Sequence, residues 1–129
     1  MILVDTSIWI ELLNGKLGGY VDPEQLLRFA VCGPVVQEVM QGLRPGAASI
    51  KTRDALLAMP RLSDPLPLAL FLDAAEVYRE GRRRGVTIRS SIDCLIAAIA
   101  IANGVPVWHK DRDYEQIARY TSLRIFRGS

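Results

Sequence analysis

Residues 91–109 read SIDCLIAAIAIANGVPVWH, and this stretch decides the fold class. Residues 91–103 are apolar on nearly every side, which predicts a buried helix that ends before Gly104. Ser90 or Ser91 is expected to cap its start. Residues 105–109 then predict a strand. Strands separated by helices pair in parallel and carry helices on both faces, so the stretch indicates an α/β fold.

The same alternation continues along the rest of the chain. Short apolar runs predict strands at 2–4, 30–32, 105–109 and 123–126, and 86–88 stays open between strand and loop. Helical patterns and their Pro, Ser and Gly boundaries predict helices at 7–14, 23–29, 34–43, 47–58, 66–84, 91–103 and 114–120. We therefore expect one domain over 1–129, a three-layer α/β/α sandwich with a central, mainly parallel sheet.

Composition is that of an ordinary globular protein. The chain has 129 residues, of which 50% are hydrophobic and 23% charged. The longest apolar run, Cys94 to Ala102, is nine residues and too short to span a bilayer. The first residues lack a signal-peptide layout, so we expect a cytoplasmic protein without membrane contact. Cys32 and Cys94 are expected to be reduced core thiols, and with a single histidine they cannot form a structural zinc site.

Acidic residues follow the ends of predicted strands. Asp5 comes directly after strand 2–4, and Asp111 and Asp113 follow strand 105–109. Ligand sites of parallel sheets lie at the carboxyl ends of the strands. Each of these acids, taken alone, is equally explained as a helix cap or a first-turn acid.

Asp93 lies in the first turn of the buried helix. A carboxylate there is costly unless it is paired or binds a metal ion, and the metal ligand is the favoured interpretation. The alternatives are the helix dipole, or a buried ion pair with Arg89 or Arg53.

Glu38 is at the edge of the apolar stripe of helix 34–43 and, taken alone, fits a solvated surface residue. Together with the other acids it suggests a crevice of carboxylates, whose mutual repulsion a divalent cation removes. Oxygen ligands select a hard ion, Mg²⁺ or Mn²⁺. Thr6 and Ser7 are expected to hydrogen-bond the ligating carboxylates.

These motifs resemble the PIN domain, specifically the VapC-type toxins of toxin–antitoxin pairs. The matching stretches cover essentially the whole chain: ILVDTSIW at 2–9, VVQEV at 35–39, RSSIDCLIAA at 89–98 and HKDRDY at 109–114. The acids of the family fall on Asp5, Glu38, Asp93 and Asp111. Asp113 is close enough to share the fourth role or to replace Asp111, and Tyr114 stands where phenylalanine is frequent.

The resemblance implies a metal-dependent endoribonuclease that leaves 5′-phosphate and 3′-hydroxyl ends. Asp5 and Asp93 would be the central ligands, and Asp111 would complete the site. Glu38 would bind a second ion or orient the attacking water. Mg²⁺ is the expected cofactor, with Mn²⁺ as the alternative, and structured RNA such as tRNA is the favoured substrate.

The charge balance agrees with a polyanionic substrate. The net charge is +2, but setting aside the five site acids leaves 16 basic against 9 acidic residues, a balance of +7. The candidate RNA contacts are Arg82, Arg83, Arg84, Arg89, Lys110, Arg112 and Arg119. For 82–84, a solvated helix end that complements the dipole is an equal alternative.

The resemblance also implies a VapB-type antitoxin partner and a homodimer. The antitoxin's C-terminal segment would lie along an apolar groove near the first helices and push an arginine or acid into the metal site. Trp9, Leu12 and Leu13 are interpreted as core, and His109 as a partly packed strand-end residue.

Other classes fit less well. A receiver domain or a haloacid-dehalogenase-type phosphatase needs a further acid close to Asp5, and Thr6 and Ser7 follow instead. A non-catalytic module that binds RNA or a partner stays open.

Overall fold

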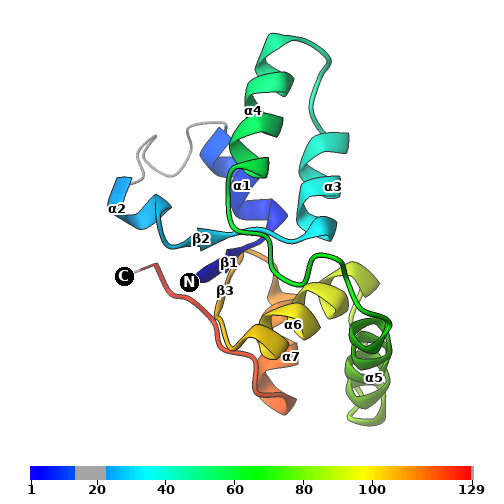
Figure 1. The fold of residues 1–129 in the computed structure, drawn as a ribbon. Coiled ribbons are helices and arrows are strands. Elements are labelled where there is room, and N and C mark those ends of the chain that lie inside the picture. Colours follow the sequence, from blue (N-terminus) through cyan, green and yellow to red (C-terminus); the bar gives the residue numbers. More distant parts are fainter. Residues whose placement is uncertain (14–22, 129) are drawn as a thin grey trace.

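A small parallel sheet forms the centre of the molecule. The computed structural model describes residues 1–13 and 23–128. Strand β1 (Ile2–Val4) lies between β2 (Phe29–Ala30) and β3 (Val107–Trp108), and both pairings are parallel. Ile2 is in register with Phe29, and Leu3 with Val107. The predicted parallel sheet is confirmed (Figure 1).

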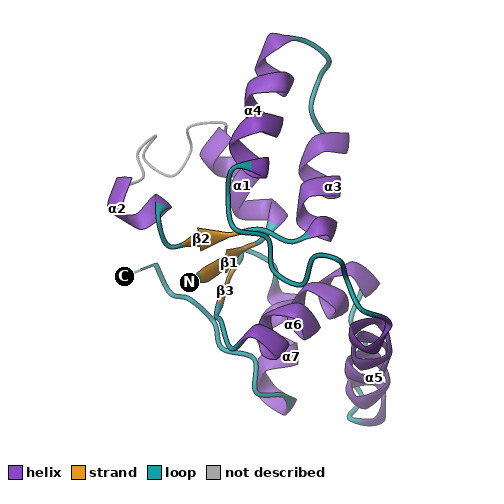
Figure 2. Ribbon diagram, viewed as in Figure 1, coloured by secondary structure: helices purple, strands orange, loops and turns teal. Residues whose placement is uncertain are grey.

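Helices cover both faces of this sheet. They are α1 (Thr6–Leu13), α2 (Pro23–Leu26), α3 (Gly33–Gln41), α4 (Ala47–Leu57), α5 (Leu68–Arg83), α6 (Ser91–Asn103) and α7 (Arg112–Tyr120). In Figure 2, α1, α3 and α4 lie above the strands, and α5, α6 and α7 lie below them. This arrangement confirms the three-layer α/β/α sandwich.

Helix α6 is the buried helix that the sequence predicts, with the same bounds. Residues 93–100 are all buried. The side chain of Ser90 accepts a hydrogen bond from the Asp93 N–H at 3.3 Å, so Ser90 and not Ser91 is the cap. Gly104 ends the helix in the left-handed conformation, with φ of 65°.

Several elements are shorter than predicted. The prediction of a strand at 123–126 is wrong, because this segment forms only one parallel bridge, Val107 to Ile125. Residues 86–88 are loop. Strand β3 begins at Val107 because Pro106 has no N–H to donate to a neighbour. Helix α2 ends at Leu26 because the chain soon enters β2, and α5 begins only after the extended Pro67. The predicted end of the first helix, at 14–15, lies outside the described residues.

The core lies between the sheet and the two helical layers. Cys32 and Cys94 are free thiols buried within it, as expected. Trp9 packs edge-on against Phe29, with ring centroids 5.9 Å apart, which confirms it as a core residue. Leu13 is 45% exposed, so its assignment to the core is wrong. No helix in the described ranges is long and apolar enough to cross a membrane.

Candidate metal centre

Asp5 is held at the carboxyl end of the central strand. Its backbone N–H donates to the Trp108 carbonyl at 2.9 Å, which fixes it beside the end of β3. The Ser7 hydroxyl donates to Asp5 Oδ2 at 2.8 Å, as expected from the sequence. The Tyr114 hydroxyl donates to Asp5 Oδ1 at 2.8 Å. Both oxygens of this buried carboxylate therefore have partners.

Asp93 is buried with one oxygen unsatisfied. Its Oδ1 lies 3.2 Å from the Tyr114 hydroxyl, whereas its Oδ2 has no hydrogen-bond partner in the described part of the chain. Burial, followed by the charges of Asp5 and Asp111, raises the pKa of Asp93 to about 7. The alternative of an ion pair is not realised, because Arg89 pairs with Asp111 and Asp113, and Arg53 pairs with Asp54.

Asp111 and Asp113 occupy the start of α7. Asp111 caps the helix, since its Oδ1 accepts a 2.9 Å hydrogen bond from the Asp113 N–H. Asp113 is buried, and its Oδ2 accepts from the Arg89 backbone N–H at 3.0 Å. The Arg89 guanidinium lies 3.7 Å from Asp111 and 3.8 Å from Asp113. Asp111 thus combines helix capping with a place in the acidic cluster.

Three of the acids are close enough to share one ion. One carboxylate oxygen each from Asp93, Asp111 and Asp113 lies within 4.8 Å of the others. Asp5 joins this cluster through the shared Tyr114 hydroxyl. The donor set consists only of oxygen atoms, which suits a hard divalent cation.

Glu38 is tied to the same end of the sheet by Thr6. The Thr6 hydroxyl donates to Glu38 Oε1 at 2.9 Å, although the two residues are far apart in sequence. Glu38 is half-buried in α3. Its charge and that of Asp5 both raise the pKa of the buried Cys32 thiol, after the larger effect of burial itself. Glu38 therefore lies near Asp5 without belonging to the group of three.

Tyr114 is a site residue that sequence reasoning missed. Its side chain is fully buried, and its hydroxyl faces Asp5 and Asp93. Burial and the two carboxylates raise the pKa of Tyr114 well above its ordinary value, so the hydroxyl keeps its proton and donates. The available signal was chemical: a buried tyrosine needs a partner for its hydroxyl.

His109 orients the loop that carries Asp111. Its Nδ1 accepts a 3.0 Å hydrogen bond from the Asp111 N–H, and its Nε2 lies 3.3 Å from Glu115. Burial lowers the pKa of His109 below its ordinary value, so the neutral ring is favoured. The ring also packs on Tyr114, with centroids 5.0 Å apart. The single histidine is thus a packed residue that contacts Tyr114 and holds the backbone of Asp111.

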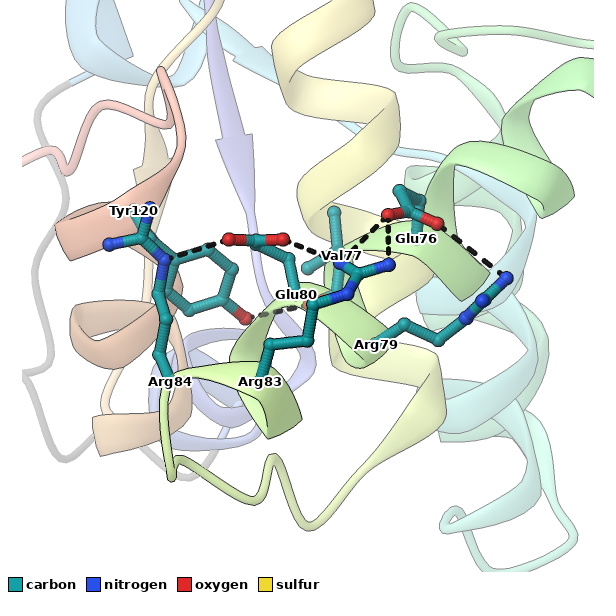
Figure 3. A network of polar contacts seen from close by, with 7 residues as sticks. All are labelled: Glu76, Val77, Arg79, Glu80, Arg83, Arg84 and Tyr120. Atoms are coloured by element: carbon teal, nitrogen blue, oxygen red, sulfur yellow. Dashed lines mark hydrogen bonds and ion pairs between the residues drawn. The ribbon is translucent and has the colours of Figure 1, made fainter.

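The candidate RNA contacts differ in how their charges are used. Figure 3 shows Arg83 and Arg84 paired with acids of their own helix, at 2.9 Å to Glu76 and 2.9 Å to Glu80 respectively. Arg82 lies over the Tyr78 ring at 5.6 Å. The charges of Arg83 and Arg84 are partly neutralised by these acids, and all three side chains are exposed.

The basic residues beside the acids are exposed as well. Lys110 pairs with Glu11 at 2.6 Å, and Arg119 hydrogen-bonds Gln116 at 3.5 Å. Arg112 is exposed and has no ion pair with any residue of 1–13 or 23–128.

Carboxylate oxygens gathered at the carboxyl ends of a parallel sheet could hold a divalent cation, and this arrangement is typical of one class of α/β domain. The PIN domain family model matches residues 2–120, and the chain belongs to this family. It is 37% identical to the VapC ribonuclease Mb1587 of Mycobacterium bovis and to Ribonuclease VapC11 of Mycobacterium tuberculosis, over 96% of this chain and of each relative. The structure of VapBC2 from Rickettsia felis, bound to a DNA fragment from its promoter, shares the fold with a TM-score of 0.68, 18% identity and 98% coverage of both chains.

Proposed function

We propose that this protein is a metal-dependent endoribonuclease and the toxin of a VapBC-type toxin–antitoxin pair. The observation that carries the proposal is Asp93 Oδ2, a buried carboxylate oxygen without a hydrogen-bond partner in the described ranges, set among other acids. An ionised oxygen in that position is unfavourable unless a cation binds it. The similarity to proteins named VapC ribonucleases supports RNA as the substrate.

The acids have different roles in the proposed site. Asp5 and Asp93 are taken as the central ligands, and Asp5 is joined to Asp93 through the Tyr114 hydroxyl. Asp111 and Asp113 lie close enough to Asp93 to complete an all-oxygen site that suits Mg²⁺, or Mn²⁺ in its place. When bound, such an ion polarises the scissile phosphate, lowers the pKa of a bound water and offsets charge on the leaving 3′ oxygen. Thr6 and Ser7 hold Glu38 and Asp5 in fixed orientations.

Glu38 lies outside the group of three and is free to act on water or to bind a second ion. Its carboxylate keeps one oxygen on Thr6, which leaves the other for a water that attacks the phosphate. Cleavage by this route gives 5′-phosphate and 3′-hydroxyl ends.

The substrate is an RNA held by its backbone. Arg89 and Arg112 flank the acids, and Arg82, Arg83 and Arg84 extend the basic surface along the end of α5. Outside the five site acids the chain has 16 basic against 9 acidic residues, which favours binding of a polyanion. We favour a structured RNA such as tRNA.

The partners follow from the same assignment. A VapB-type antitoxin would cover the apolar groove between α1 and α3, a hollow of about 140 Å³ lined by Ile10, Leu13, Val39, Gly42 and Leu43. The exposed position of Leu13 agrees with such a contact. The toxin itself would form a homodimer and act in the cytoplasm.

Cleavage of total RNA tests the proposal. Purified protein is incubated with Mg²⁺, Mn²⁺ or EDTA beside the Asp93→Asn variant, which removes a charge but keeps the shape. Discrete fragments that need metal are expected, with activity lower by more than about a hundredfold in the variant. Asp54→Asn, an exposed acid of α4, is the control and should cleave like the wild type.

A variant Asp93→Asn that cuts at the wild-type rate would contradict the metal site. Absence of cleavage in every condition would favour a non-catalytic module, provided that a mass spectrum shows no co-purified antitoxin.

A further inference from the structure

One phenol connects the two central carboxylates. The Tyr114 hydroxyl lies 2.8 Å from Asp5 Oδ1 and 3.2 Å from Asp93 Oδ1. Asp5 follows β1, Asp93 is in α6 and Tyr114 is in α7, so this single group joins three elements at the centre of the site. The hydroxyl is buried with both acids, away from competing water.

The Tyr114 hydroxyl determines which carboxylate oxygens of Asp5 and Asp93 remain without a hydrogen-bond partner. It contacts Oδ1 of both acids, while Ser7 takes Oδ2 of Asp5. Asp93 Oδ2 is left as a buried oxygen without a hydrogen-bond partner among residues 1–13 and 23–128. The terminal torsion of an aspartate is broad and would otherwise let each carboxylate turn. Contact with the hydroxyl restricts both carboxylates to one orientation.

We propose that Tyr114 is a positioning residue that orients Asp5 and Asp93 for a divalent cation. The inference rests on the proposed function, because it takes these two acids as ligands. Hydrogen-bonding partners of metal ligands typically contribute 10- to 100-fold to metal affinity. Tyr114 therefore makes the site bind its ion more tightly than the same acids would without the hydroxyl.

A purely structural role for Tyr114 makes a different prediction. The ring fills space in the core and packs on His109, and phenylalanine would keep both properties. Tyr114→Phe thus removes only the hydroxyl. If the residue merely packs, the variant loses some stability and its metal affinity stays unchanged.

Tyr120 supplies a matched control in the same helix. Its hydroxyl donates a 2.8 Å hydrogen bond to the Val77 carbonyl, a partner outside the acidic cluster (Figure 3). Tyr120→Phe also removes one hydroxyl and one hydrogen bond of the same length as that between Tyr114 and Asp5. A change that appears only in Tyr114→Phe reports on the carboxylates.

Mn²⁺ binding to the full chain is the experiment. Free Mn²⁺ is counted by its electron paramagnetic resonance signal in titrations of the wild type, Tyr114→Phe, Tyr120→Phe and Asp93→Asn, after circular dichroism has confirmed their folds. We expect about tenfold weaker binding in Tyr114→Phe, wild-type binding in Tyr120→Phe, and loss of binding in Asp93→Asn. Equal affinity in Tyr114→Phe and the wild type would overturn the inference.

Different outcomes test the proposed metal site and the role of Tyr114. A wild type that does not bind Mn²⁺, or an Asp93→Asn variant that binds equally well, overturns the proposed metal site and this inference with it. If Tyr114→Phe does not fold, Tyr20, Tyr78 and Tyr120 are instead replaced by phenylalanine, so that Tyr114 is the only tyrosine of the chain, and its difference absorbance is followed during Mn²⁺ titration. A change that saturates with the ion supports the role of Tyr114, and an unchanged tyrosine spectrum contradicts it.

Discussion

The raised pKa of Asp93 links the stability of the protein to pH. Burial and its acidic neighbours raise the pKa of this carboxyl from 3.8 to about 7. The unfolded chain releases the proton near the lower value, whereas the folded chain holds it until the upper one. Between these values the folded state binds more protons, so stability falls as pH rises. In the metal-free protein the ionised Asp93 therefore carries a free-energy cost at neutral pH, which binding of a cation would offset.

This linkage predicts a pH-dependent difference between wild type and Asp93→Asn. Without metal, the variant should gain stability relative to the wild type as pH rises from about 4 to about 7, by a few kcal/mol in all. Urea unfolding in EDTA at several pH values measures this gain. Mn²⁺ should stabilise the wild type at the upper end of the range and leave the variant unchanged. The same difference in stability at about pH 5 and about pH 8 would contradict the assigned pKa shift.

The candidate acids could be predicted from the sequence, but the role of Tyr114 between Asp5 and Asp93 could not. Asp5 and Asp111 are recognisable because each follows a strand, and Asp93 because a charge in an apolar helix is costly. Tyr114 bonds acids that lie 109 and 21 residues away, so no local pattern reveals the contact. Its hydroxyl acquires a function only once three elements have come together.

Helix α5 depends on close contact with the end of α7. Gly81 is buried, and a Cβ at this position would lie 2.6 Å from the Tyr120 hydroxyl oxygen and 3.2 Å from the Val86 carbonyl oxygen. The Tyr120 hydroxyl is fixed by its bond to the Val77 carbonyl, and Val86 contributes a backbone atom. Neither neighbour can yield without a change in the packing of α5.

Gly81→Ala is therefore expected to destabilise the protein by about 2 kcal/mol, the cost of overpacking a close contact. Urea unfolding measures this effect. Gly42→Ala is the matched control at the end of α3, because its Cβ would meet only ordinary contacts, of 3.6 Å and 3.7 Å. Equal free energies of unfolding for the two variants would contradict this prediction, because α5 and α7 would then accommodate the added methyl group without loss of stability.

The bounds of long helices could be predicted from the sequence more accurately than those of short strands. Helix α6 has the predicted bounds because its cap, its apolar run and Gly104 all agree. The segment 123–126 has strand-like residues, yet pairing depends on the length of its neighbour. Strand β3 has only two residues, so Ile125 finds a single partner there. Strand pairing depends on the tertiary structure, and the strand propensities of the residues alone do not predict it.

At the scale of the whole molecule, the five candidate site acids lie near the carboxyl ends of the strands, whereas exposed arginines lie on the surface. This distribution suits an anionic chain that approaches the proposed cation site. Arg112 is exposed next to Asp111 and has no ion pair among the described residues. Arg83 is exposed too, but it pairs with Glu76 and Glu80. The acids lower the positive potential that Arg83 offers to a phosphate, so the two arginines should contribute unequally.

RNA binding at varied salt tests this distribution of charge. The protein carries Asp93→Asn throughout, so that the RNA is bound without being cut, and bulk tRNA is the probe. Adding Arg112→Ala should weaken binding several-fold and reduce the slope of log affinity against log salt by about 1, because one phosphate contact is lost. Adding Arg83→Ala should change both quantities less, since the charge removed was already shared with Glu76 and Glu80. Equal effects of the two substitutions would show that RNA breaks the ion pairs of α5 on binding, and the substrate path would then extend along that helix.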